Sequence, residues 1–215
     1  MQDKKINFRF KEFIDVYRKQ LTLVGVVILS TAVFVIALTY LPSFGGGGDV
    51  PESFSQARIR AGDAANRISE ITDTYKASIE AIAEAERSGN YSAGQNLILQ
   101  EVEKNEKVSE IAGDLAEELG DMARSAQGIR SDETKEVALS AVSTGIELVQ
   151  HIITYNNATR ELLSVLEVRL ENGGGIDSRA IIEELISILN EEADTINRLG
   201  GEYRELMSQF DKLAR

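Results

Sequence analysis

The single histidine is the first residue to test for chemistry, because metal sites in helical bundles are built from histidine and carboxylate side chains. His151 follows Glu147 by four positions. The carboxylate di-iron pattern instead needs a Glu-x-x-His pair from each of two helices, which one histidine cannot supply. The sequence contains no cysteine, and this excludes disulfides, thiolate zinc sites and cysteine nucleophiles. We therefore expect no metal, no cofactor and no catalytic residues, and we predict that the chain is not an enzyme.

A polar group formed by Asn156, Thr159 and Arg160 interrupts an otherwise apolar pattern. Two interpretations stay open. Hydrogen-bonding side chains in such a place can form a ligand-binding pocket, or a polar residue in a helix seam can set the register of neighbouring helices. Under the second interpretation, we expect replacement of Asn156 by Leu to leave the fold as stable as before, or more stable.

Charged and glycine-rich runs indicate neither a phosphate site nor a calcium site. The acidic runs at 80–86, 101–110 and 183–192 have the spacing of solvated helix faces, without an EF-hand pattern. The glycine runs at 45–48 and 173–175 lack the lysine and the spacing of a P-loop. The sequence has 23 Lys and Arg against 35 Asp and Glu, so its net charge is -12. That balance argues against a nucleic-acid partner.

Residues 21–41 form a run of 21 residues without a charge, which predicts a transmembrane helix in contact with the lipid bilayer. Residues 1–20 hold six Lys and Arg against three Asp and Glu. The positive-inside rule therefore predicts a cytoplasmic N-terminus and an outward C-terminal domain, periplasmic or extracellular. A cleavable signal peptide is the alternative, although the apolar run is longer than the roughly 7–15 residues typical of one. The tail itself is basic and amphipathic, with an apolar stripe of Phe10, Phe13, Ile14 and Tyr17.

Residues 42–52 hold both prolines and four consecutive glycines, so we expect a flexible linker there. Residues 53–215 contain no proline. Polar, glycine-containing clusters at 88–90, 128–132 and 172–175 divide this domain into four predicted helices, and Asp177 or Ser178 is placed to cap the fourth. The predicted fold is all-α, with a single N-terminal transmembrane helix followed by a long, coiled-coil-like, up-down-up-down four-helix bundle.

Each predicted helix carries an apolar seam on alternating three- and four-residue steps, which supports the bundle. The third seam includes Gly145 and Asn156, and the fourth runs from Ile182 to Leu213. The same seams could instead meet a second chain in an intermolecular coiled coil. In architecture alone, the plan resembles the ligand-sensing four-helix bundle of bacterial chemoreceptors. That resemblance implies a ligand-sensing domain, but no second apolar span follows in this sequence, so signalling would need a partner protein.

The sequence therefore predicts a membrane-tethered helical bundle for protein–protein interaction or scaffolding at the outer face of the cytoplasmic membrane. Its partner is another protein or a further copy of the chain. The alternative is an extracytoplasmic sensory or ligand-binding bundle that acts with a partner and reads its ligand at Asn156, Thr159 and Arg160.

Overall fold

The computed structural model describes residues 49–172 and 178–214. These residues form five α-helices and no strand: α2 (Glu52–Thr72), α3 (Tyr75–Arg87), α4 (Tyr91–Ala126), α5 (Asp132–Glu171) and α6 (Arg179–Leu213). The predicted all-helical fold is confirmed. The predicted tail at 1–20, the transmembrane helix at 21–41 and most of the linker at 42–52 lie outside the described residues.

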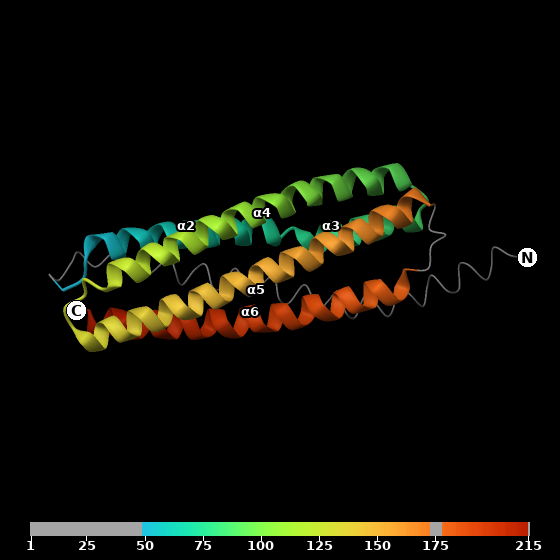
Figure 1. The fold of residues 1–215 in the computed structure, drawn as a ribbon. Helices are drawn as coiled ribbons and strands as arrows, with labels where there is room; N and C mark the ends of the chain where they lie inside the picture. Colours follow the sequence, from blue (N-terminus) through green and yellow to red (C-terminus); the bar gives the residue numbers. More distant parts are fainter. Residues whose placement is uncertain (1–48, 173–177, 215) are drawn as a thin grey trace, which may run out of the picture.

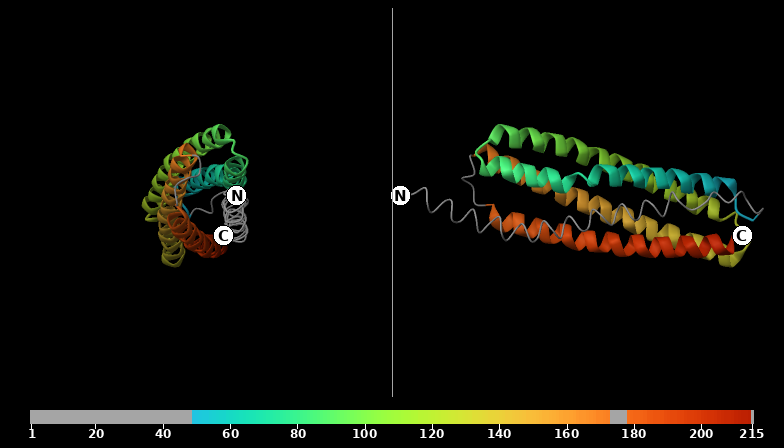
Figure 2. Two further views of the ribbon diagram at one scale, coloured as in Figure 1. Left: turned by 90° about the vertical axis from the view of Figure 1, so that its right-hand side faces the viewer. Right: turned by 180° about the vertical axis from the view of Figure 1, so that it is seen from behind.

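The helices run alternately up and down a long rod (Figure 1). Helices α2 and α3 lie end to end along one side, and both pack against α4. Helix α4 packs against α5, and α5 against α6. The end-on view in Figure 2 shows these helices as a curved row rather than a square. At one end of the rod α2 also meets α6, where the rings of Phe54 and Phe210 lie 5.0 Å apart.

The predicted first helix is wrong in one respect, because it is two helices with a break at Asp73 and Thr74. Side-chain hydroxyls cluster at this break. The hydroxyl of Thr72 donates to the carbonyls of Ile68 and Ser69, and that of Thr74 donates to the carbonyl of Ile71. Such bonds compete with the backbone ladder and bend or end helices.

The turns at 88–90 and 127–131 fall where the sequence predicts them. Gly89 has a φ of 72°, and the amide of Asn90 donates to the carbonyl of Ala85, as in a Schellman motif. Asn90 then caps α4, and Ser131 caps α5. Ser178 occupies the N-cap position of α6 but makes no capping bond. Its φ and ψ of -102° and 13° are not the extended values that direct a cap side chain to the helix amides.

Gly145 allows three helices to approach closely at the middle of the rod. A Cβ atom on it would lie 2.9 Å from Cδ2 of Leu119 on α4 and 3.3 Å from Cε2 of Tyr203 on α6. Leu119 and Tyr203 are both buried. The small residue that the sequence places on the third seam is therefore a steric requirement of the core.

Gly145→Val should destabilise the fold by on the order of 1–3 kcal/mol, because the added methyl groups force the side chains of Leu119 and Tyr203 out of their places. Gly113→Val is the matched control, since a Cβ atom on Gly113 meets nothing within 4 Å. It should change stability by less than about 0.5 kcal/mol. Urea denaturation followed by circular dichroism measures both. Equal midpoints for the two variants would show that α5 does not need a glycine at this contact.

Candidate functional site

A pair of buried asparagines joins α4 to α5 near the middle of the rod. Asn105 and Asn156 are 1% and 2% exposed. The Asn105 amide nitrogen donates to the Asn156 side-chain oxygen at 2.6 Å and to its backbone carbonyl at 2.9 Å. In return, the Asn156 amide donates at 2.8 Å both to the Asn105 carbonyl and to the Ser109 hydroxyl. The side-chain amide of each asparagine thus donates its hydrogen bonds to the other helix.

The other two residues of the predicted ligand site do not converge with Asn156. Thr159 is buried, and its hydroxyl donates to the Tyr155 carbonyl of its own helix at 3.0 Å. Arg160 is exposed and forms an ion pair with Glu106 of α4 at 3.5 Å. Asn156 therefore lies in the core, Thr159 bonds to the backbone of its own helix, and Arg160 lies in solvent.

Sequence reasoning missed Asn105, and a usable signal was present. The second seam continues on the same steps toward the N-terminus from Val108 through Asn105 to Glu101, and all three positions are buried. One oxygen of Glu101 accepts from the Ser78 hydroxyl at 2.7 Å and from the Lys104 ammonium at 2.6 Å. A seam that becomes polar on one helix predicts a polar partner on the next.

Three tyrosines are buried along the same interior: Tyr75, Tyr155 and Tyr203. Burial raises the pKa of Tyr155 and of Tyr203 to about 12 in each case. Burial also raises the pKa of Tyr75, and the negative charge of Glu101 adds to that shift. These hydroxyls therefore stay neutral at physiological pH and act as hydrogen-bonding or packing groups, without a role as bases.

The single histidine bridges α5 and α6. Its Nδ1 atom lies 2.6 Å from Oε2 of Glu192, and both side chains are partly buried. The pair ties the two helices together. Within residues 49–172 and 178–214, no group of three or more His, Asp or Glu side chains is placed to hold a metal ion.

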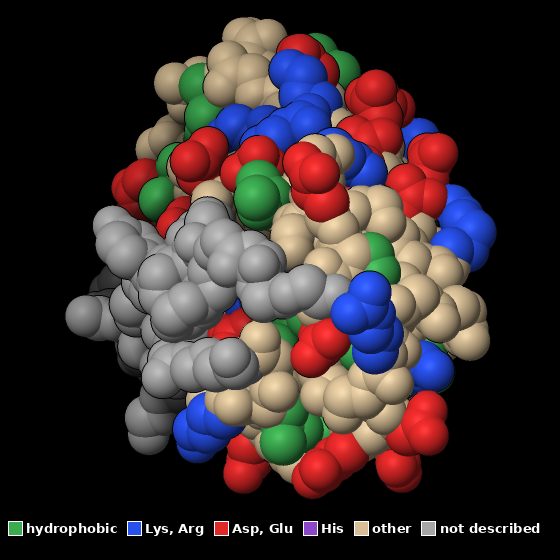
Figure 3. All heavy atoms as spheres, turned by 90° about the vertical axis from the view of Figure 1, so that its left-hand side faces the viewer, with side chains coloured by type: hydrophobic (Ala, Val, Ile, Leu, Met, Phe, Trp, Pro, Cys, Tyr) green, Lys and Arg blue, Asp and Glu red, His purple; other side chains and the backbone are tan. Residues whose placement is uncertain are grey.

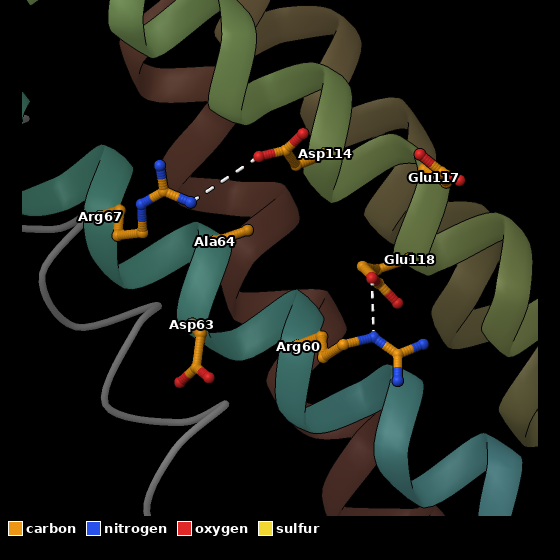
Figure 4. Close-up of a pocket in the computed structure, with 7 residues that line it drawn as sticks. All are labelled: Arg60, Asp63, Ala64, Arg67, Asp114, Glu117 and Glu118. Atoms are coloured by element: carbon orange, nitrogen blue, oxygen red, sulfur yellow. Dashed lines mark hydrogen bonds and ion pairs between the residues drawn. The ribbon is translucent and has the colours of Figure 1, made fainter.

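A charged groove of about 250 Å³ runs between α2 and α4 (Figure 4). Arg60 lies 2.7 Å from Glu118 and 3.4 Å from Asp121, and Arg67 lies 3.7 Å from Asp114. Hydrogen bonding to Glu118 raises the pKa of Arg60. Both guanidinium groups are thus neutralised by carboxylates of the facing helix, and the groove is a ladder of interhelical ion pairs that a ligand would first have to open.

Comparison of the chain with protein-family models, with curated proteins and with solved structures finds no match.

Asn156→Leu should cost about 1–3 kcal/mol of stability, because the buried Asn105 amide loses its bond to the Asn156 side chain and keeps only the bond to the Asn156 backbone carbonyl. This differs from the expectation based on the sequence alone, which did not include Asn105. The double variant Asn105→Leu with Asn156→Leu should recover most of that loss, since neither helix then buries an unpaired amide. Exposed Asn96→Leu is the control. Urea denaturation of the wild type, of both single leucine variants at 105 and 156 and of the double variant measures the coupling, and additive losses in the double variant would contradict a direct amide pair.

Stability should fall as the pH rises from about 10 to about 12. The buried tyrosines keep their protons in the folded state through this window, whereas in the unfolded state they ionise near their ordinary pKa of about 10. The unfolded state then binds fewer protons than the folded state, so the free energy of unfolding decreases with pH. Tyr203→Phe should lessen this slope. An unchanged slope in that variant, by denaturation at several pH values, would contradict the buried-phenol interpretation.

Proposed function

We propose that the chain is a membrane-tethered helical scaffold that holds protein partners at the outer face of the cytoplasmic membrane. Residues 21–41 anchor it, residues 1–20 stay in the cytoplasm, and the linker at 42–52 allows the domain at 53–215 to move relative to the membrane. The support for the anchor is the uncharged run and its basic flank in the sequence.

The observation that carries the scaffold role is the use of the interior polar groups. The amides of Asn105 and Asn156 bond to each other and to Ser109, and the hydroxyl of Thr159 bonds to its own helix. A small-molecule site needs convergent polar groups that are free to meet a ligand. In this bundle, these polar groups instead bond to one another and fix the register of the helices. This favours a function on the outer faces of the rod, and a function other than catalysis.

Helix α5 is long and apolar enough to cross a membrane by length and composition alone. Buried helices of bundles pass the same test, and α5 packs against both α4 and α6. We therefore assign the membrane anchor to residues 21–41 and treat α5 as a bundle helix.

The sensory alternative places a ligand at Asn156, Thr159 and Arg160. It requires the amide pair to separate so that Asn156 becomes available, at the cost of an unpaired buried amide on α4. In that case, the double leucine variant at positions 105 and 156 would fold and yet lose a ligand-dependent response. A folded double variant with normal activity favours the scaffold.

The topology can be tested with single cysteines, because the chain has none of its own. Arg130→Cys places a thiol in the exposed turn between α4 and α5, where the Arg130 side chain is 76% exposed. In intact cells whose outer barrier has been opened, a membrane-impermeant maleimide should label this variant. The matched variant Gln2→Cys should react only after lysis. Labelling of Gln2→Cys alone in intact cells would reverse the proposed orientation, and labelling of neither would place both the N-terminus and the turn at 130 inside.

A further inference from the structure

The outward face of α5 differs from those of its neighbours in its lack of charge. Exposed positions between 140 and 157 hold one charged side chain, Glu147. We name this surface the α5 neutral face and define it by the exposed residues Ser140, Ser143, Ile146, Glu147, Gln150, Ile153, Thr154 and Asn157. Figure 1 shows α5 in front of its neighbours along the middle of the rod.

The neighbouring helices present acidic surfaces over comparable lengths. Exposed positions of α4 between 103 and 117 hold one lysine and five acids: Glu103, Glu106, Glu110, Asp114 and Glu117. Exposed positions of α6 between 179 and 196 hold one basic side chain, Arg179, and four acids: Glu183, Glu184, Glu191 and Asp194. The end of the rod seen in Figure 3 is also charged, with acidic and basic side chains interspersed.

Two exposed isoleucines recur at a regular spacing on the α5 neutral face. Ile146 and Ile153 are each 39% exposed and lie seven positions apart, so they share one stripe of the helix. Polar uncharged residues fill the intervening steps at Ser143, Gln150 and Asn157. The alternating spacing of three and four residues from Ser143 to Asn157 is that of a coiled-coil seam. Each of its positions follows a core-seam position by one residue, so the stripe lies about 100° around α5 from the core seam.

This pattern points to a second copy of the chain as the occupant. The sequence has a net charge of -12, so two copies that meet through α4 or α6 bring acid against acid, which costs several kcal/mol. The α5 neutral face holds one exposed acid, Glu147, so two copies that meet there bring fewer like charges together than copies that meet through α4 or α6. In a parallel pair, each residue of the stripe also meets its own counterpart, and the amides of Gln150 and Asn157 can bond across the pair.

We propose that two copies of the chain associate through the α5 neutral face as a parallel, in-register pair. Ile146 and Ile153 form its apolar contacts, and Gln150 and Asn157 set its register, as polar residues at such seam positions do in parallel coiled coils. The pairing rests on the α5 neutral face alone. Its parallel sense also agrees with the proposed anchor, because it leaves both N-terminal segments at the same end of the pair.

The first test measures the oligomeric state of the full chain in detergent by sedimentation. The wild-type chain should sediment as a dimer. The double variant Ile146→Glu with Ile153→Glu should be a monomer, with its dissociation constant raised on the order of 100-fold or more. The matched control replaces exposed apolar residues elsewhere, Ile59→Glu with Leu99→Glu, which are 53% and 59% exposed. This control should stay dimeric, and circular dichroism should show equal helicity in all three proteins.

The second test uses single cysteines in the otherwise wild-type chain. Ser143→Cys, Gln150→Cys and Asn157→Cys should each form a disulfide with the same position of the second copy under mild oxidation. Gly113→Cys, on the exposed face of α4, should not. In an antiparallel pair centred near 148, only the variant nearest the centre could crosslink, because positions 157 of the two copies would be separated by roughly 27 Å at 1.5 Å per residue.

Several outcomes would overturn the proposal. A monomeric wild-type chain, or a dimer that survives the double glutamate variant, would show that the α5 neutral face does not pair. Crosslinking at 150 alone would replace the parallel pair with an antiparallel one. A monomer in lipid nanodiscs whose labelled Gln150→Cys reports an apolar environment would assign this face to the bilayer. The cysteine labelling that tests the anchor is independent of all these results, so the two proposals fail separately.

Discussion

The paired amides of Asn105 and Asn156 set the axial position of α4 against α5, and the contacts along the rod depend on that position. Apolar seams with a 3.5-residue repeat can slide by one repeat with little loss of apolar contact. A slide by seven residues would bury both amides without a partner, at about 1–3 kcal/mol for each unpaired group. The same register brings Leu119 of α4 against Gly145, where a larger residue would not fit.

Two interhelical ion pairs, one partly buried and one buried, also fix the arrangement of the helices, at the two ends of the rod. Arg58 of α2 binds Asp211 of α6 through two bonds of 2.6 and 3.0 Å. Glu86 of α3 binds Arg169 of α5 at 2.5 Å. Buried pairs of this kind add little net stability, because desolvation offsets most of the attraction, but breaking one of them is costly. They therefore select one arrangement of the helices among several of similar apolar burial.

The parts of this fold that sequence reasoning predicts are those coded by local residues. Glycine and asparagine at 88–90 end one helix and cap the next, and the absence of proline after 51 permits the long helices that follow. The break at Asp73 was missed, because hydroxyl bonds to the backbone weaken a helix without any glycine or proline to mark the place. The pairing of Arg58 with Asp211 joins residues 153 positions apart, and no local pattern specifies such a contact. The amide pair is intermediate, since each asparagine lies on a readable seam while their meeting depends on the register of two helices.

The distribution of charge follows from the same division between inside and outside. The amides of Asn105 and Asn156 bond to each other in the interior, whereas most of the acidic residues of α4 and α6 lie on exposed faces, where solvent screens them. An acidic rod with many like charges resists nonspecific association, because copies that approach in most orientations repel one another. Because the competing orientations are disfavoured by this repulsion, an uncharged stripe can select one orientation of two copies even when its own contacts are weak. At ordinary ionic strength, salt screens the repulsion between exposed charges that are more than about 8–10 Å apart. The acidic faces therefore discriminate most between orientations when the salt concentration is low.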